Sequence, residues 1–283
     1  MNGKDNMTIE TKYSKDFFVL KENITKILDF NTLQYSDSFI DRRFKTRLNH
    51  FKFNTYHEYW KLLKNDLQEQ KKLRKELTIN VTEFFRDHST FNVLQNIIIP
   101  EIINQKNDTI NIWSAGSSDG REAYSIAMLF IEKMGEYDAK RKLRIIGTDI
   151  DQDCLECARS GIYKENSGYE QMPVENQLSY FKNHQKYFDI KDGSYTFKPS
   201  VKELVHFEFH DLISGNKKTN FDIIFCRNVV IYFNRELKNK LYIDFYNALK
   251  TGGKLILGKS ETLSGDAMQH FKKYNLIERI YLK

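Results

Sequence analysis

The sequence predicts an α/β protein in two parts, a small all-α part followed by a larger part built on a parallel sheet. Up to about residue 75, apolar residues recur at helical spacing and no strand pattern occurs. From about residue 90, strand and helix patterns alternate, which is typical of a parallel sheet covered by helices. One strand candidate, 221–226, is almost continuously apolar, as a central buried strand requires.

Length and composition are those of a globular protein. With 283 residues and 40% hydrophobic content, the chain can bury a sizeable core. No apolar run reaches the roughly 18–20 residues of a membrane span, and the polar residues 1–6 do not resemble a secretory signal. Three cysteines, an odd number, fit a reducing compartment. We therefore expect a cytoplasmic protein without membrane insertion.

The helical part carries an excess of positive charge. Residues 40–75 contain eleven Lys and Arg against four Asp and Glu, an excess of +7, while the whole chain carries +6. Arg43 and Arg47 lie four residues apart, so we expect both on one exposed helix face. Such a face can steer an acidic partner, whether nucleic acid, membrane surface or protein, but an ordinary solvated helix would carry the same charges.

Each element follows from its own pattern. Two helical stripes precede residue 75, formed by Ile40, Phe44, Leu48 and Phe51 and by Tyr56, Tyr59, Trp60, Leu63 and Leu67. Strands are expected at 110–113, 143–147, 206–210, 221–226, 254–258 and 276–281, with the last one at the sheet edge. Asn234 is expected to cap the helix before the fifth strand, and Gly252-Gly253 to end that helix.

The stretch 168–200 is too long for an ordinary loop between two elements. Within it, apolar residues alternate on both sides of Asp192-Gly193. Asp-Gly between two alternating runs is a strong hairpin signal. We therefore expect a small β insertion that projects from the main sheet.

Glycine and polar residues follow the predicted strands, at the edge where open α/β sheets bind ligands. These residues are Gly116, Gly120, Asp149, Asp211, Arg227 and Asn228. A glycine loop lets the backbone approach a ligand, and an acid after the second strand can accept the hydroxyls of a ribose. This predicts a nucleoside-containing cofactor, although a tight turn with a helix-capping Asp149 would look the same. Glu122 favours a cationic ligand group over phosphate, and the loop lacks the lysine of ATP and GTP sites.

Six longer motifs resemble the CheR-type chemotaxis receptor methyltransferases, and they fall in that family's order. They are 77–86, 112–127, 147–151, 158–163, 221–233 and 258–262, and the stretch 42–59 is similar too. The resemblance implies a helical domain and linker at 1–88. It also implies a Rossmann-like S-adenosylmethionine methyltransferase domain at 89–283, with a β-subdomain inserted at 168–200.

The resemblance also implies an activity and a partner. The protein would transfer methyl groups from S-adenosylmethionine to glutamate side chains of chemotaxis receptors, for sensory adaptation. The products would be glutamyl methyl esters and S-adenosylhomocysteine. The cytoplasmic domain of the receptor would dock on the basic N-terminal helices. A monomer is expected, because no heptads or long exposed apolar stripe can be identified in the sequence.

Site residues are implied one by one. The cofactor-binding set is Asn80, Thr82, Arg86, Gly116, Glu122, Asp149, Asp211, Leu212, Arg227 and Asn228. In the family, the segment of the first three closes over the methionine end of the cofactor, Glu122 contacts the amino group and Asp149 the ribose. Asp211-Leu212 flanks the adenine, and Tyr232 matches the tyrosine near the transferred methyl group.

The chemistry agrees with this site. A glutamate is ionised at neutral pH, so methyl transfer to it needs no general base but mainly proximity, alignment and desolvation. The predicted cleft accordingly offers no nucleophile–base pair. We hypothesise that Arg86 and Tyr232 are catalytic, in that they orient the reacting groups.

The chain departs from the family pattern in three places. Arg121-Glu122-Ala123 stands where Glu-Glu-Pro is common, and Asp211 where many relatives have Asn. The insertion has no paired glycines in 181–190, whereas relatives that grip a C-terminal receptor peptide carry a glycine-rich loop there. We therefore expect no tight peptide tether.

The remaining cysteine and histidine residues predict no metal site, and the sequence disfavours three other functions. Cys154 and Cys157 have no second pair at zinc spacing, Cys226 has no adjacent base, and His206 and His210 lie on a strand, so no metal is expected. A nucleic-acid methyltransferase usually has Asp/Asn-Pro-Pro-Tyr after the fourth strand, which is absent here, so no nucleic-acid partner is expected. A homologue that binds the cofactor or a receptor without transferring methyl groups would not need the retained site residues, so this alternative is disfavoured. An NAD-dependent oxidoreductase would need a Gly-x-Gly-x-x-Gly loop, which is absent here.

Overall fold

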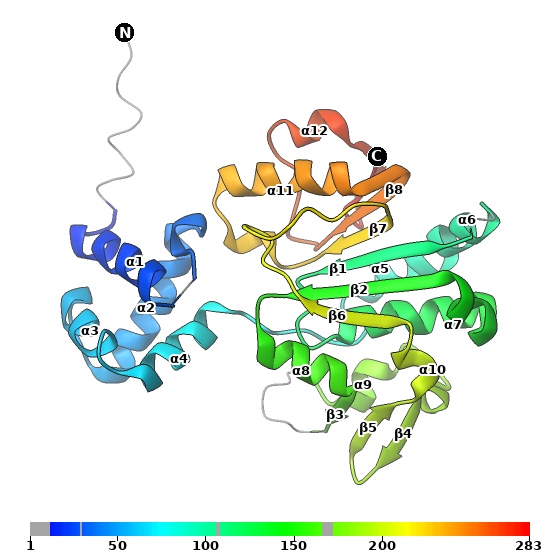
Figure 1. The fold of residues 1–283 in the computed structure, drawn as a ribbon, viewed down its shortest axis with the longest axis horizontal. Coiled ribbons are helices and arrows are strands. Elements are labelled where there is room, and N and C mark those ends of the chain that lie inside the picture. Colours follow the sequence, from blue (N-terminus) through cyan, green and yellow to red (C-terminus); the bar gives the residue numbers. More distant parts are fainter. Residues whose placement is uncertain (1–11, 29, 106–107, 166–171) are drawn as a thin grey trace. The chain divides into compact units, whose positions relative to one another are not determined.

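A computed structural model describes residues 12–28, 30–105, 108–165 and 172–283 (Figure 1). The chain forms two compact units. The first contains the described residues up to Ile79 together with Tyr232–Leu237, and the second contains the rest. No helix in the described ranges is long and apolar enough to cross a membrane.

The first unit is all-helical, as predicted. Its α-helices within the described residues are α1 (Lys15–Leu28), α2 (Asp37–Phe51), α3 (Tyr56–Leu63) and α4 (Leu67–Leu77). Thr55 and Glu58 cap α3 reciprocally, each side chain bonding the other's backbone N–H. Phe17, Ile40 and Phe44 are completely buried and form part of the core of this unit.

The second helical stripe was predicted wrongly at its end. Leu67 does not continue the stripe of Tyr59 and Leu63, because a new helix begins there. The Asp66 carboxylate accepts hydrogen bonds from the N–H groups of Gln68 and Glu69 and thereby starts α4. Leu67 is consequently 70% exposed.

Arg47 was also predicted wrongly, because it does not lie on an exposed face. Its side chain is buried, and its Nε donates to Glu69 Oε1 at 2.8 Å. The Tyr59 hydroxyl donates to the same carboxylate oxygen at 2.6 Å. Arg43 is partly exposed and lies over the ring of Phe39, 5.4 Å from its centroid. The basic surface of α2 therefore lacks Arg47.

The second unit is built on a mostly parallel sheet, as predicted. Its strand order is β6-β2-β1-β7-β8-β10-β9, and the first five run parallel to one another. Their bounds are β1 Ile110–Ala115, β2 Leu143–Asp149, β6 Val205–Phe209, β7 Phe221–Cys226, β8 Leu249–Leu257, β9 Lys272–Asn275 and β10 Ile280–Leu282. This is the Rossmann-like arrangement that the family resemblance implies.

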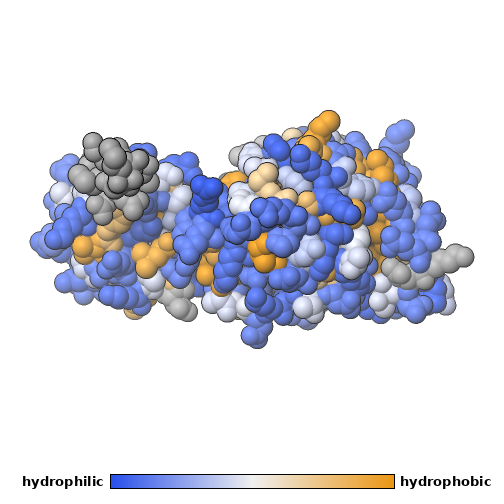
Figure 2. Space-filling view, turned by 90° about the horizontal axis from the view of Figure 1, so that it is seen from above, coloured by the Kyte–Doolittle hydropathy of each residue, from blue (hydrophilic) through white to orange (hydrophobic). Residues whose placement is uncertain are grey.

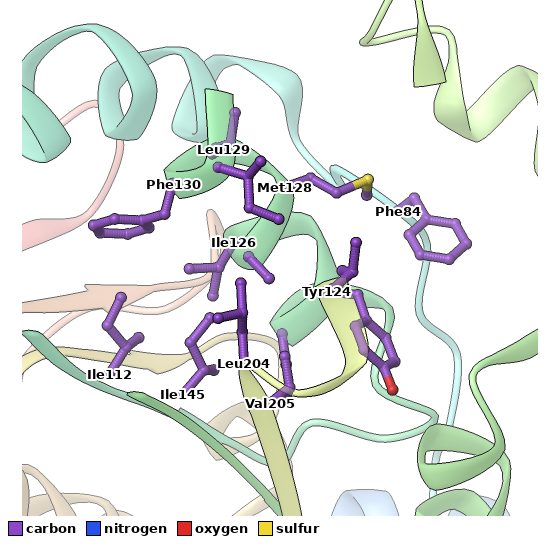
Figure 3. Packing of buried hydrophobic residues seen from close by; sticks show 14 of the residues in the cluster. Phe84, Ile112, Tyr124, Ile126, Met128, Leu129, Phe130, Ile145, Leu204 and Val205 are labelled. Carbon is purple, nitrogen blue, oxygen red and sulfur yellow. The ribbon is translucent and has the colours of Figure 1, made fainter. Parts of the chain in front are cut away.

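Helices cover both faces of the sheet (Figure 1). One face carries α7 (Arg121–Lys142), which packs on β1, β2 and β6. Figure 3 shows Ile126 and Leu129 of this helix in one cluster with Ile112 and Ile145 of the strands. The remaining helices are α5 (His88–Val93), the π-helical turn Leu94–Ile98, α6 (Ile99–Asn104), α8 (Gln152–Ser160), α9 (Val174–Leu178), α10 (Pro199–Lys202), α11 (Arg235–Ala248) and α12 (Ala267–His270).

Side chains alternate across β1 between these two helical layers. Ile112 joins the cluster under α7, whereas Trp113 lies 5.5 Å from Phe245 of α11, measured between ring centroids.

Most of the surface that Figure 2 shows is hydrophilic, with apolar residues scattered over it.

The C-terminal part differs from the prediction in two ways. Gly252 and Gly253 do not end α11, which stops at Ala248; they lie inside β8, where the pairing with β7 shifts register. The stretch 276–281 is mostly a turn, and only its end enters β10. β10 lies between β8 and β9, so the edge strand is β9.

A second, smaller sheet contains the predicted hairpin. Its order is β3-β5-β4, with β3 Ile162–Lys164, β4 Phe188–Lys191 and β5 Ser194–Phe197. Asp192 and Gly193 both have positive φ, 50° and 70°, as a two-residue hairpin turn requires. The predicted start of this insertion at 168 lies outside the described residues. The boundaries 1–88, 89–283 and 168–200 stay predictions.

Candidate cofactor site

The glycine loop joins β1 to α7 and is held against the end of β2. The N–H groups of Gly116 and Ser117 both donate to the carbonyl of Thr148, each at 2.8 Å. Gly116 has φ +79°, and a Cβ on it would lie 2.5 Å from Cγ2 of Val229. Glycine is therefore required at Gly116 by both its backbone conformation and its neighbour.

Asp149 ends β2 beside this loop. Its Oδ2 accepts the N–H of Ser118 at 2.8 Å, and its Oδ1 accepts the N–H of Asp151 at 3.0 Å. Burial raises the pKa of Asp149, and the two amide hydrogen bonds oppose that rise. Each carboxylate oxygen has a further lone pair, so the group can also accept hydroxyls such as those of a ribose.

Glu122 lies in the first turn of α7 and pairs with Arg227. Its Oε1 accepts the Ser114 hydroxyl at 2.7 Å, and its Oε2 lies 3.2 Å from Arg227 Nη1. Arg227 Nη2 also donates to Asp87 Oδ2 at 2.7 Å. Two carboxylates thus share one guanidinium, which leaves a net negative charge suited to a cationic ligand group such as an ammonium.

The segment 80–86 is fastened to the start of α7 through its own backbone. The Ser118 hydroxyl donates to the carbonyl of Asn80 at 3.1 Å, and Arg121 Nη1 donates to the carbonyl of Thr82 at 3.3 Å. The Asn80 side chain donates to Asp151 Oδ2 at 2.7 Å. The structure therefore brings Asn80 and Thr82 to the glycine loop and Asp149.

Arg86 ends this segment and reaches the Glu122–Arg227 pair. The carbonyl of Arg86 accepts a hydrogen bond from Arg227 Nη2 at 2.8 Å. Its own guanidinium donates to the carbonyl of Val81 at 3.0 Å, and the other N–H groups of a guanidinium can serve a ligand.

Asn228 follows β7 in a left-handed conformation, with φ 60°. Among the described residues its Oδ1 is buried and accepts no hydrogen bond. A buried acceptor of this kind normally has a partner. An orphaned amide oxygen beside the glycine loop therefore fits a site that takes a polar ligand.

Two predicted residues lie after β6. The carboxylate of Asp211 accepts the N–H of Ile213 at 2.8 Å and the Ser214 hydroxyl at 2.5 Å. Asp211 thus shapes its own loop, which includes the half-buried Leu212. The loop follows Phe209, the partner of Asp149 across β2 and β6, so it leaves the sheet at the same edge.

Tyr232 belongs to the first unit. Its ring lies 4.9 Å from that of Phe39, and its carbonyl accepts the N–H of Ser36 at 2.9 Å. The side chain is half-exposed.

Glu261 lies in the motif 258–262, and no sequence pattern predicts a role for it. This carboxylate is 3% exposed and accepts N–H groups from four backbone positions. No spacing rule reveals such a residue, because its donors come from two separate loops.

The cysteines and histidines that the sequence singles out lie in separate surroundings. Cys157 packs against the core and Cys226 is completely buried, so burial raises the pKa of its thiol. His210 lies edge-on to Trp113, with 5.7 Å between ring centroids. No group of three potential metal ligands occurs in the part of the chain that the structure describes.

Two family models match the chain: "CheR methyltransferase, all-alpha domain" over residues 15–78 and "CheR methyltransferase, SAM binding domain" over residues 80–280. The boundary between them falls where the first unit gives way to the second. Together the two matches account for most of the chain.

Curated relatives agree. The chain is 31% identical to the chemotaxis protein methyltransferase of Borreliella burgdorferi, covering 92% of this chain and 94% of that one. It is 29% identical to that of Listeria innocua, covering 89% and 92%, and 38% identical to that of Vibrio parahaemolyticus, covering 67% of each. It also spans 24% of an uncharacterized 104.1 kDa protein of Rhodobacter capsulatus, at 31% identity.

The two family matches agree with the two units of the fold. They also agree with the glycine loop and Asp149, which suit a nucleoside-containing cofactor. The chain therefore belongs to the CheR methyltransferase family and is an S-adenosylmethionine-dependent methyltransferase.

Proposed function

We propose that the protein methylates glutamate side chains of chemotaxis receptors and thereby serves sensory adaptation in the cytoplasm. The family match over both units carries this proposal. The products are glutamyl methyl esters and S-adenosylhomocysteine. A glutamate carboxylate is already a nucleophile at neutral pH, so orientation and exclusion of water are what the protein has to supply.

S-Adenosylmethionine supplies the methyl group when it is bound. Asp149 holds the ribose hydroxyls, and Glu122 holds the ammonium of the methionine part. The glycine loop at Gly116 gives the backbone close access, and Asn228 offers its amide oxygen. The remaining cofactor-binding residues are Asn80, Thr82, Arg86, Asp211, Leu212 and Arg227. The contacts among Glu122, Arg227, Arg86 and the loop support one shared site.

Arg86 and Tyr232 are the catalytic residues in this proposal. Arg86 can hold an anionic group through its guanidinium, which suits a carboxylate acceptor. The Tyr232 hydroxyl orients the reacting groups as a hydrogen-bond donor or acceptor.

The receptor docks on the first unit through opposite charge. Its exposed basic residues between 40 and 75 are Arg42, Lys45, Lys52, Lys61, Lys64, Lys71, Lys72 and Lys75. Arg47 is buried against Glu69 and contributes nothing to this surface. We propose that the acidic cytoplasmic domain of the receptor binds here, that the enzyme acts as a monomer, and that the β insertion holds no receptor tail tightly.

Methyl transfer to purified receptor fragments tests the proposal. S-Adenosylmethionine with a labelled methyl group is supplied with fragments that carry either Glu or Gln at the candidate positions. Label on the Glu fragments alone, released as methanol by mild base, is the expected result. Label on the Gln fragments, or label that resists base, would contradict carboxyl methylation.

A further inference from the structure

Glu261 joins the ends of two neighbouring parallel strands. Its Oε2 accepts the N–H groups of Gly258 at 2.7 Å and Asn228 at 2.9 Å. Its Oε1 accepts those of Val229 at 3.0 Å and Ile231 at 3.3 Å. Gly258 follows β8, while the other three donors follow β7. Bonds from N–H groups to an ionised carboxylate are stronger than neutral ones, so one side chain fixes both loops.

The loops pack too closely for another arrangement. Gly258 has no room for a side chain, because a Cβ there would lie 2.8 Å from both the Asn228 nitrogen and Glu261 Oε2. Asn228 is held at φ 60°, a conformation uncommon outside glycine. The four bonds of the Glu261 carboxylate therefore help to hold the backbone in this left-handed conformation, which asparagine adopts more readily than most residues.

The loop after β7 carries residues of the proposed cofactor site. Arg227, at its start, pairs with Glu122. Asn228 presents its orphaned amide oxygen, and Val229 lies against Gly116 of the glycine loop. A displacement of this loop would move all three contacts together.

We infer that Glu261 is a positioning residue that sets cofactor affinity through the backbone of Asn228 and Val229. It acts through this loop rather than by contact with the cofactor. The inference rests on the proposed assignment of Asn228 to the cofactor site. Replacement by Gln would turn one acceptor into an N–H donor that faces backbone N–H groups, and it would remove the charge.

A matched pair of variants tests the inference in the full-length chain. Asp222→Asn is the control, because Asp222 is buried on β7, the strand that leads into this loop, and also accepts a backbone N–H, from Asn111 at 2.7 Å. Asp222 lies at the start of the strand, away from the loop. Affinity for S-adenosylmethionine is measured by calorimetry, stability by thermal unfolding, and exchange of the Asn228, Val229 and Ile231 amides by NMR or mass spectrometry.

We expect Glu261→Gln to weaken cofactor binding by about tenfold, because misplacing the loop would cost the cofactor about as much as one charge-assisted hydrogen bond to it. The variant should also speed exchange of these amides. Asp222→Asn should lower the melting temperature but leave affinity and loop exchange unchanged. Equal affinities in the two variants would overturn the inference. If Glu261→Gln does not fold, Glu261→Asp is measured instead. This variant keeps the charge on a shorter side chain, and an affinity equal to that of Asp222→Asn would again overturn the inference.

This test does not depend on the methyl acceptor. If the wild-type protein binds the cofactor but labels no receptor, the proposed substrate fails, while the comparison of Glu261→Gln with Asp222→Asn still decides the role of Glu261.

Discussion

At the residue scale, the proposed contact of Glu122 with the amino group of the cofactor can be tested separately from recognition of the nucleoside. Glu122→Gln keeps the shape and the acceptor for Ser114 but removes the charge next to Arg227. Loss of a hydrogen bond to a charged group costs about 1.5–3 kcal/mol, so S-adenosylmethionine should bind about 10- to 100-fold more weakly.

Adenosine, which lacks the ammonium, is the matched ligand for this variant. Its affinity should not change in Glu122→Gln, whereas Asp149→Asn should weaken adenosine and S-adenosylmethionine alike. Calorimetric titration of both ligands measures this. Weaker adenosine binding in Glu122→Gln would show that Glu122 acts on the loop and not on the amino group.

The Glu278 carboxylate should make the free energy of unfolding depend on pH. Burial alone would raise its pKa, but hydrogen bonds from Lys259, Thr90 and Ser89 outweigh burial and hold the pKa below the ordinary 4.5. A carboxylate with a lowered pKa stabilises the fold above its unfolded pKa, and this contribution is lost as the pH falls through the folded pKa.

The variant Glu278→Gln should therefore be less stable than the wild type at pH 7, and the difference should shrink below pH 4.5. Urea unfolding at a series of pH values measures the free energy of unfolding for both proteins. A difference that stays constant into acid would refute the assignment of this stability to the ionised carboxylate.

At the element scale, the segment 80–86 depends on a residue that departs from the family pattern. Arg121 donates to the carbonyl of Thr82, and its guanidinium lies 5.0 Å from the ring centroid of Tyr163. We expect Arg121→Ala to speed amide exchange across 80–86 and to weaken S-adenosylmethionine binding several-fold, since one hydrogen bond is worth about 0.5–1.5 kcal/mol. Hydrogen exchange and calorimetry measure the two effects.

Arg159→Ala is the matched control for this variant. Arg159 also donates to a backbone carbonyl, that of Phe207 at 3.2 Å, but it lies on α8 and outside the segment. It should leave exchange in 80–86 and the cofactor affinity unchanged. The same affinity loss in both variants would mean that Arg121 acts only through general stability.

The elements also show which parts of the fold the sequence could predict. β7 was predicted to the residue, because a short, almost continuously apolar run rich in isoleucine and phenylalanine is typical of a buried strand. Gly252-Gly253 was read as a helix stop, but these residues form the irregular part of β8, where the register shifts. Glycine marks an irregular backbone without saying which element contains it.

Side-chain partners distant in sequence were harder to predict than elements. Arg47 looked exposed because its charge suits a helix surface, yet its partner Glu69 lies 22 residues away. The role of Glu261 could not be predicted for the same reason, since its donors become neighbours only when β7 and β8 pair. The sequence predicted the site residues that follow the strands, and the family resemblance implied their roles. Neither predicted that Glu261 holds the loop after β7.

At the scale of the whole molecule, the charge of the first unit should control the encounter with the receptor and not the chemistry of the second. Arg42 on α2 and Lys72 on α4 are exposed. Reversing both charges with Arg42→Glu and Lys72→Glu should lower kcat/KM for the receptor about tenfold at low salt, because steering by opposite charge raises association rates by about 10- to 1,000-fold. Affinity for S-adenosylmethionine should stay as in the wild type.

Two comparisons make this last prediction specific. Lys272→Glu changes an exposed lysine of the edge strand β9 in the second unit and should leave kcat/KM almost unchanged. Raising the ionic strength should slow the wild type towards the double variant, because a Debye length of about 8 Å at 0.15 M screens charges separated by more than that. Rates that fall equally for Lys272→Glu would mean that only net charge matters. A double variant with unchanged kcat/KM would place receptor recognition elsewhere than on the basic helices.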